Sequence, residues 1–503
     1  MTKKILILSV FVVASCGLAY ELIAGALSSY LLGDSVLQFS TIIGCYLFAM
    51  GVGAHLSKYV KDEHVLARFV DVELAVGLVG GVSAALLFLT FSWMAAPFRL
   101  LLYVLVFLIG AMVGMEVPLV MRALNARQTG FAEIVSRVLT FDYLGALAVS
   151  LLFPLVLAPY LGLVRTGFLF GMLNIGVALW TIHVFRAELG NLAGRTLRAC
   201  GVLAVLAFGF ASADRMTHFG EHGLFGDEIV YATSTPYQRL VITRWKDDTR
   251  LYINGNLQFS SRDEYRYHEA LVHPVMEKLP WARRVLVLGG GDGLALREIL
   301  RYPNVRQVTL VDLDPAMTNA FRARAELVAL NHGSLSDPRV KILNADAAQW
   351  LEHTAEMFDA VIVDFPDPSS FALGKLYSVP FYGMVRHHMA AHGLMVVQST
   401  SPFFAPHAFW TVDATLREVG LRTSPYHAYV PSFGEWGFII ASPQAAYQPP
   451  TSYRMPMRFL DAATTAEMFR FPADMQPLTM APNRLDTQSL VHAFEQDWRR
   501  TIR

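Results

Sequence analysis

The sequence predicts a helical domain that crosses the membrane several times, followed by an α/β domain built on a doubly wound sheet. Three observations predict this fold class. Long apolar stretches fill the first two-fifths of the 503 residues, in a chain that is 54% hydrophobic and 16% charged. The composition turns polar after Asp214. From Arg283 to Ser442, short apolar strands alternate with helical stretches, as in sheets whose parallel strands are joined by helices.

Residues 1–213 form the expected transmembrane domain of about seven helices. Most candidate spans are long enough for a bilayer core, which needs about 20 residues. The first is too long for the apolar part of a signal peptide, and no small-residue cleavage site follows it, so we expect it to be retained. The lipid bilayer of the inner cell membrane is therefore an expected partner. The spans are residues 5–32, 37–59, 70–93, 98–119, 138–160, 163–185 and 197–213.

The charges between the spans indicate an orientation. Most lysines and arginines fall on one side, for example Lys58 and Arg186, and few on the other, for example Arg165. Positive loops favour the cytoplasm, so we expect the amino terminus there. Seven full spans would place the remaining chain on the opposite side. The seventh span, residues 197–213, is the weakest because it is short, contains Arg198 and is interrupted by glycines, and we expect it not to cross fully.

Three acids, Glu21, Glu116 and Asp142, lie within apolar spans. Ionisable groups at such positions are costly and often functional. A structural interpretation stays open, in which Glu116 bonds loosened backbone before Pro118 or an arginine such as Arg122. Cysteines occur only in or beside the spans, at positions 16, 45 and 200, so the soluble part offers neither a disulfide framework nor a cysteine metal site.

A small β domain is expected over residues 227–262. Apolar and polar residues alternate there on both sides of two turn sequences, Lys246-Asp247-Asp248 and Asn254-Gly255, which is typical of antiparallel hairpins. Residues 263–279 then read as a helix. The strand that follows it, Val285 to Leu288, is an unbroken apolar run and is expected to be buried on both faces of a parallel sheet.

This strand opens the motif that points to a ligand. It ends in Gly289-Gly290-Gly291-Asp292-Gly293, where glycines let the backbone approach a ligand closely, and a helix follows. The next strand, Val308 to Val311, places Asp312 at its carboxyl end, where an acid can accept hydrogen bonds from both ribose hydroxyls of a nucleoside. Ordinary turns from strand to helix also use glycine, so the turn alone does not settle the matter.

Further motifs give the chain a family resemblance. In order and spacing they resemble the polyamine aminopropyltransferases, the spermidine synthase family, over about residues 231–442. The family implies a Rossmann-like domain of the class I methyltransferase type over residues 263–445, with a tail or cap over residues 446–503. Two further stretches, SCGLAYELIAG and VPSFGEWGF, resemble the membrane-anchored bacterial members. The motifs are Tyr237-Gln238, DEYRYHE (263–269), Asp346 in NADA, VDFPDP (363–368) and LYSVPFY (376–382).

The resemblance implies aminopropyl transfer from decarboxylated S-adenosylmethionine to a diamine such as putrescine, giving spermidine and methylthioadenosine. An amine near pKa 10.4 carries the wrong proton at neutral pH, so the reaction needs a base. By resemblance Asp364 is that base, Asp367 holds the amine, Tyr267 orients it, and Asp292 takes the ammonium of the donor. Asp367 alone would also fit a turn cap. The other expected donor-binding residues are Gln238, His268, Gly289, Gly291, Asp312 and Asp346, the last near the adenine amino group.

Two alternatives remain. One is a methyltransferase that uses S-adenosylmethionine on the same fold; Asp292 argues against it, because an acid repels the carboxylate of that donor. The other is a transporter or sensor that binds polyamine without turnover, which the intramembrane acids suit. At VPSFGEWG the sequence differs from the family's usual amine-pocket segment, so the identity of the amine substrate stays open. Because the implied donor is a cytosolic metabolite, we expect the soluble part to be cytoplasmic.

Decarboxylated S-adenosylmethionine is a co-substrate, and we expect no prosthetic group. The histidines lack metal-ligand spacing, so no metal is expected, and nothing points to nucleic acid. Whether the chain forms homo-oligomers stays open.

Overall fold

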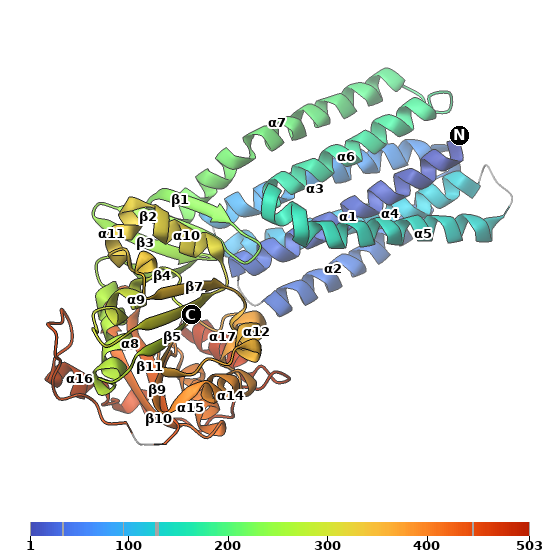
Figure 1. The fold of residues 1–503 in the computed structure, drawn as a ribbon. Helices are drawn as coiled ribbons and strands as arrows, with labels where there is room; N and C mark the ends of the chain where they lie inside the picture. The colour runs from blue at the N-terminus through green and yellow to red at the C-terminus, as the bar shows by residue number, and fades with distance from the viewer. Residues whose placement is uncertain (1, 33–34, 94, 126–129, 445–446, 502–503) are drawn as a thin grey trace. The chain divides into compact units, whose positions relative to one another are not determined.

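The computed structural model describes residues 2–32, 35–93, 95–125, 130–444 and 447–501. The other residues, 1, 33–34, 94, 126–129, 445–446 and 502–503, belong to the expected membrane domain, Rossmann-like domain and tail, and lie outside the described part. The chain divides into two compact units, Met1–Ile229 and Val230–Arg503. In Figure 1 the first unit runs from blue to green and the second from green to red.

The first unit is a bundle of long helices (Figure 1). Each of the seven α-helices in its described part is long and apolar enough to cross a membrane, judged by length and composition. The π-helical segment η3 contains Pro154 and Pro159, which cannot donate backbone hydrogen bonds and so favour a widened turn. The bounds are α1 Thr2–Leu32, α2 Ser35–Leu56, η1 Ser57–Tyr59, η2 Asp62–His64, α3 Val65–Trp93, α4 Ala95–Asn125, α5 Phe131–Leu152, η3 Phe153–Leu161, α6 Leu163–Val184 and α7 Leu192–Phe225.

The seventh helix differs from the expectation. α7 continues without a break for 34 residues, and its stretch Leu192–Thr217 alone is long and apolar enough to span a bilayer. The prediction that this segment is short and interrupted at Gly201 and Gly209 is therefore wrong. A glycine inside a helix costs only about 1 kcal/mol relative to alanine, and the surrounding apolar residues continue the helix on both sides.

Helices α2 and α4 pack closely through glycines. A Cβ atom on Gly53 would lie 1.8 Å from the carbonyl oxygen of Ala111, and one on Gly114 would lie 2.1 Å from that of Met50. Only a residue without a side chain permits this backbone approach, which is how small residues hold membrane helices together.

The second unit begins with a four-stranded sheet in the order β1-β2-β3-β4. The strands are β1 Glu228–Ser234, β2 Arg239–Trp245, β3 Asp248–Ile253 and β4 Asn256–Ser260. The two expected hairpins form, since β2 pairs with β3 and β3 with β4, both antiparallel. Asn254 and Gly255, which have φ of 50° and 83°, make the second turn in the left-handed region that these residue types tolerate.

A seven-stranded sheet forms the core of this unit, in the order β10-β11-β9-β8-β5-β6-β7. The five strands from β9 to β7 are parallel, and β11 and β10 are added antiparallel at one edge. After β7 the chain returns to the other side of β5, which creates a switch point between β5 and β8. The strands are β5 Arg284–Gly289, β6 Gln307–Asp312, β7 Val340–Asn344, β8 Phe358–Asp364, β9 Met389–Gln398, β10 Arg422–Val430 and β11 Gly434–Ser442.

Helices cover both faces of this sheet. Alternate residues of β5 face opposite cores, with Val285 and Val287 in one and Leu286 and Leu288 in the other. The first core packs against α8 Glu264–Lys278, α9 Leu294–Ile299, α10 Pro315–Ala323, α11 Ala325–Asn331 and α16 Ala462–Met468. The second packs against α12 Ala347–His353, α14 Val379–His387, α15 Pro406–Glu418 and α17 Ser489–Thr501. The short helices are η4 Ser334–Ser336, α13 Phe371–Gly374, η5 Lys375–Tyr377 and η6 Ala473–Met475.

The carboxyl-terminal residues pack into the α/β fold. The carboxylate of Glu269 in α8 accepts hydrogen bonds from three successive backbone N–H groups, those of Arg458, Phe459 and Leu460, at 2.8 to 3.1 Å. Further along, the buried Asp497 accepts from the backbone N–H of His407 at 2.9 Å and from its ring at 2.7 Å. The described part of residues 446–503, for which the sequence predicted only a tail or cap, thus packs on the domain and bonds to it at both of these places.

Candidate active site

The carboxyl ends of β5 and β8 meet at the switch point and bring the glycine turn against Asp364. Gly289 pairs with Asp364 in the strand register, and the backbone N–H of Gly290 donates to the carbonyl oxygen of Asp364 at 3.1 Å. Gly289 has φ of 79°, and a Cβ atom there would lie 2.2 Å from the same carbonyl oxygen. Glycine is therefore required by both the conformation and the close approach.

Asp292 and Asp312 lie side by side at this end of the sheet. The carboxylate of Asp312 accepts from the backbone N–H of Gly291 at 3.1 Å and from that of Asp314 at 3.0 Å. That of Asp292 accepts from the backbone N–H of Leu294 at 2.9 Å. Burial raises the pKa of each carboxyl to about 6. The negative charge of Asp364 adds to the effect on the pKa of Asp292, while His268 opposes it.

Tyr267 comes from α8 and reaches across to the end of β8. Its hydroxyl donates to Oδ1 of Asp364 at 2.6 Å. Burial raises the pKa of the Asp364 carboxyl, although His268 and the Tyr267 hydrogen bond oppose the shift. Burial, and then the Asp364 charge, also raises the pKa of the Tyr267 hydroxyl, so the tyrosine stays a hydrogen-bond donor.

A buried ion network holds His268. Nδ1 of His268 lies 2.8 Å from Oε2 of Glu264, and the guanidinium of Arg297 bonds both oxygens of Glu264, at 3.0 and 2.9 Å. Burial alone would lower the pKa of His268, but Glu264 outweighs it and raises the pKa above the ordinary value. Glu264 lies in the DEYRYHE motif, yet neither it nor Arg297 was among the predicted site residues, since only the folded chain reveals that they meet.

Asp367 lies in the loop after β8 and is held by side chains. Nε2 of Gln398, at the end of β9, donates to its Oδ1 at 3.3 Å, and the Thr400 hydroxyl donates to its Oδ2 at 3.5 Å. Gln398 also donates to the backbone carbonyl of Phe365 at 2.7 Å and accepts from the Trp436 ring N–H at 3.2 Å. Burial raises the pKa of Asp367 to about 7. These partners differ from those of a turn cap, which would bond the next backbone N–H groups.

Gln238 and Asp346 lie near the same end of the sheet, but neither bonds directly to the four acids described above. Nε2 of Gln238 donates to Oδ2 of Asp314 at 3.0 Å and so supports the segment that carries Asp312. Asp346 caps the start of α12, accepting from the backbone N–H of Ala348 at 2.9 Å, and its other oxygen pairs with Nζ of Lys375 at 2.7 Å. Burial would raise the pKa of Asp346, but the Lys375 hydrogen bond lowers it overall.

The carboxyl-terminal tail contributes a residue that the sequence did not single out. Asn483 is fully buried, and its amide donates to the backbone carbonyls of Gly374 at 2.9 Å and Tyr377 at 3.3 Å. It thereby holds the end of the loop that begins with Phe365 and Asp367. No sequence signal pointed to it, because a lone asparagine between Pro482 and Arg484 is typical of an exposed turn.

Together, four buried carboxylates converge on one end of the sheet, from the turn after β5, the ends of β6 and β8, and the loop after β8. Their members are Asp292, Asp312, Asp364 and Asp367. Burial raises the pKa of all four, His268 only partly opposes the shift for Asp292 and Asp364, and a bound cation would lower these pKa values. The arrangement therefore suits positively charged ligands. Among the described residues, no group of three or more His, Cys, Asp or Glu side chains has the geometry to hold a metal ion.

The chain is similar to several known proteins. A family profile described as Spermine/spermidine synthase domain matches residues 264–450. A solved spermidine synthase from Thermotoga maritima is 24% identical, with a TM-score of 0.44 over 49% of this chain and 85% of that one. Polyamine aminopropyltransferase 2 of Ralstonia nicotianae is 66% identical over 100% of this chain and 99% of its own length. A polyamine aminopropyltransferase of Leptospira interrogans is 48% identical over 99% of each chain. Because these relatives align along almost their whole length, including the helical unit, the chain belongs to the polyamine aminopropyltransferase family and is an enzyme of that type.

Proposed function

We propose that this enzyme transfers an aminopropyl group from decarboxylated S-adenosylmethionine to a diamine such as putrescine, giving spermidine and methylthioadenosine. The observation that carries the proposal is the set of four buried carboxylates at the switch point. The donor brings a sulfonium and an ammonium, and the acceptor brings ammonium groups. A site rich in buried acids stabilises these cations and would repel a ligand that carries its own carboxylate.

The reaction is a displacement at the carbon next to the sulfonium. The amine nitrogen forms a bond to this carbon as the carbon–sulfur bond breaks, and the electron pair of that bond neutralises the sulfur. The nitrogen must first give up a proton, for which Asp364 is the base. Because burial raises the pKa of Asp364, its carboxylate accepts a proton more readily than one in water. Tyr267, 2.6 Å away, fixes the direction in which this carboxylate points.

The donor occupies the glycine-turn side of the site in this proposal. Gly289 and Gly291 let it approach the backbone, Asp292 takes its ammonium, and Asp312 accepts from its ribose hydroxyls. His268 and Gln238 shape the wall around these acids. Asp346 lies at the adenine end, where an adenine amino group would share Oδ2 with Lys375. Asp367 holds the far ammonium of the diamine, with Gln398 as its support.

The first prediction concerns the base. Asp364→Asn should lower the rate of methylthioadenosine release at least a hundredfold, because an amide accepts no proton and general bases contribute about a hundredfold or more. Donor affinity, measured by calorimetry, should change by less than about tenfold, or about 1.4 kcal/mol. Tyr267→Phe keeps the carboxylate and should retain more activity than Asp364→Asn. Wild-type rates from the Asn variant would remove Asp364 as the base.

The second prediction separates the two donors. Decarboxylated S-adenosylmethionine should bind more tightly than S-adenosylmethionine, since two charges about 4 Å apart interact by roughly 1 to 4 kcal/mol. Asp292→Asn should reduce this difference in affinity between the two donors. Asp312→Asn is the matched control. It should weaken both donors equally, because both carry the same ribose. Equal affinities in the wild type would favour the methyltransferase.

The third prediction concerns pH. Asp367, with a pKa of about 7, is largely neutral below pH 7 and charged above it, so kcat/KM for the diamine should rise between pH 6 and 8. Gln398 stabilises the charged form, so Gln398→Leu should raise the pKa and move the rise to higher pH. In the Asp367→Asn variant, kcat/KM should depend on pH only through the titration of the amine substrate. If that variant keeps the wild-type profile, another group controls the pH dependence.

We further propose that the helical unit crosses the inner membrane and that the soluble unit faces the cytoplasm, where the donor is made. The loop charges favour a different placement. They put the amino terminus in the cytoplasm, and seven complete crossings would then put the soluble unit outside it. Alkaline phosphatase fused after Arg503 is active only outside the cytoplasm and should stay inactive. A fusion of the same enzyme after Lys58 provides the reference for the side with more positive charge. Strong activity of the Arg503 fusion would place the active site in the periplasm.

A further inference from the structure

The helical unit contains a second pair of buried acids, for which the reaction has no use. Glu73 of α3 and Glu116 of α4 are 0% and 1% exposed, and none of their four carboxylate oxygens has a hydrogen-bond partner in the described part of the chain. Arg122 does not neutralise Glu116, because its guanidinium bonds Asp62 and the backbone carbonyls of Ser57 and Val60. The structural interpretation of Glu116 is therefore wrong. Charged carboxylates inside a bundle are costly unless they take up a proton or a cation joins them.

Two neutral polar side chains accompany the acids without partners of their own. The Tyr20 hydroxyl of α1 and both amide atoms of Asn174 in α6 are buried and make no hydrogen bond within the described residues. The Tyr20 hydroxyl lies within electrostatic range of both glutamates. Its position is fixed, because a Cβ atom on Gly80 of α3 would lie 2.6 Å from the tyrosine ring. The carboxylates of Glu73 and Glu116 and the hydroxyl of Tyr20 thus make no hydrogen bond to any described residue.

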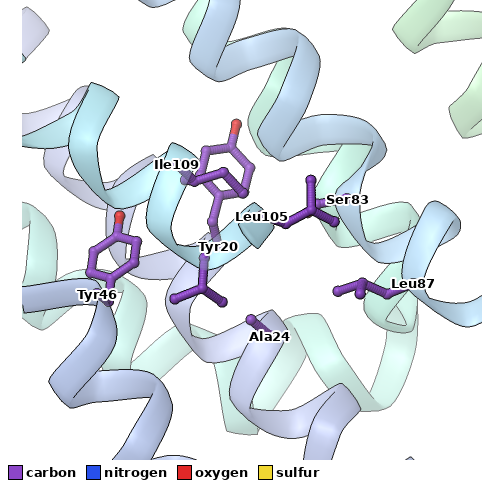
Figure 2. Close-up of a pocket in the computed structure, with 8 residues that line it drawn as sticks. Tyr20, Ala24, Tyr46, Ser83, Leu87, Leu105 and Ile109 are labelled. Carbon is purple, nitrogen blue, oxygen red and sulfur yellow. The ribbon is translucent and has the colours of Figure 1, made fainter. Parts of the chain in front are cut away.

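A small cavity in the same helical unit is lined in part by Tyr20 (Figure 2). Its volume is about 10 Å³, which is room for about one water-sized group. Tyr20 and Tyr46 line it, whereas Glu73 and Glu116 do not. The Tyr46 hydroxyl donates to the backbone carbonyl of Gly17 at 2.8 Å, so Tyr20 is the residue that the cavity shares with the unpartnered polar groups. The rest of the lining is mostly apolar and consists of Ala24, Ser83, Leu87, Leu105, Val106 and Ile109.

Both acids lie inside helices that are long and apolar enough to span a bilayer. At about 1.5 Å per residue, Glu73 is about 16 Å along the chain from Asp62, where its span begins, and Glu116 is about 14 Å from Asn125, where the next span ends. Both acids therefore lie toward the end of the bundle where α3 begins and α4 ends, and the ion pair of Asp71 with Arg195 lies two residues from Glu73.

We propose that Glu73, Glu116 and Tyr20 form a cation-binding site in the helical unit that takes the primary ammonium group of an alkylamine. An ammonium supplies three N–H donors and positive charge, which the carboxylates and the hydroxyl lack. The tyrosine faces add attraction for a cation, and the apolar lining suits the methylene next to it. No described cluster of three or more metal-ligating side chains exists, which disfavours a metal ion. The choice of an amine among organic cations rests on the function proposed for the soluble unit.

The test counts binding sites on the full chain in lipid nanodiscs with radiolabelled putrescine. Asp364→Asn with Asp367→Asn removes the soluble site, and this background should still bind one equivalent per chain. Adding Glu73→Gln or Glu116→Gln should weaken that binding at least tenfold. Adding Glu133→Gln, an exposed glutamate of α5 that pairs with Arg137, should change nothing. Methylammonium should compete with the label, whereas sodium and potassium at equal concentration should not.

Several outcomes would contradict the proposal. These are no binding in the background protein, binding unaffected by both glutamine variants, or displacement of the label by sodium. A lower Tm for both glutamine variants without ligand would also contradict it, by showing that the acids make structural bonds. Aminopropyl transfer by Glu73→Gln with Asp364 and Asp367 intact should equal the wild type. Transfer that fails in the wild type itself would instead contradict the function proposed for the soluble unit.

Discussion

The contact between the glycine turn after β5 and the end of β8 determines the geometry of the active site. Gly289 and Gly290 lie against the backbone of Asp364, so the turn and the proposed base cannot move apart without breaking the sheet. Asp292 follows within the same turn, and Gly291 bonds the carboxylate of Asp312 on the next strand. One constraint, backbone packed on backbone, therefore places three acids from three chain segments at one point.

Electrostatics impose the second constraint. Glu264 has both a histidine and an arginine as partners, and His268 and Arg297 keep its pKa low in spite of burial. His268 only partly offsets the burial of Asp292 and Asp364, and Asp367 has neutral hydrogen-bond partners, so burial raises the pKa values of all three. Glu264 is thus held in an ion pair, whereas the other three acids form no ion pair among the described residues. Burying such acids costs stability, and in the proposed function a cationic ligand would offset this cost.

The same contrast appears in the helical unit. Arg122 engages Asp62 and two carbonyls near the helix ends, while the buried Glu73 and Glu116 have no hydrogen-bond partner among the described residues. Acidic side chains occur in both units in two kinds of environment, either paired and structural or unpaired and buried. In both units the second kind lies next to tyrosines, Tyr267 in one and Tyr20 in the other. Tyr267 orients Asp364 through a hydrogen bond without cancelling its charge, whereas the Tyr20 hydroxyl makes no hydrogen bond to the described residues.

The sequence by itself determined the two-part architecture, the apolar helices, the strand alternation and the acids of the glycine turn and of VDFPDP. Local patterns suffice for these features, because hydrophobic periodicity and turn residues act between near neighbours. Only the tertiary structure decided that Gln398 supports Asp367, that Arg297 neutralises Glu264 and that Asn483 holds the loop after β8. It also decided that α7 continues through its glycines and that Glu73 meets no partner. These facts depend on contacts between residues far apart in the chain, and burial or pairing of a side chain exists only once the surrounding elements have packed.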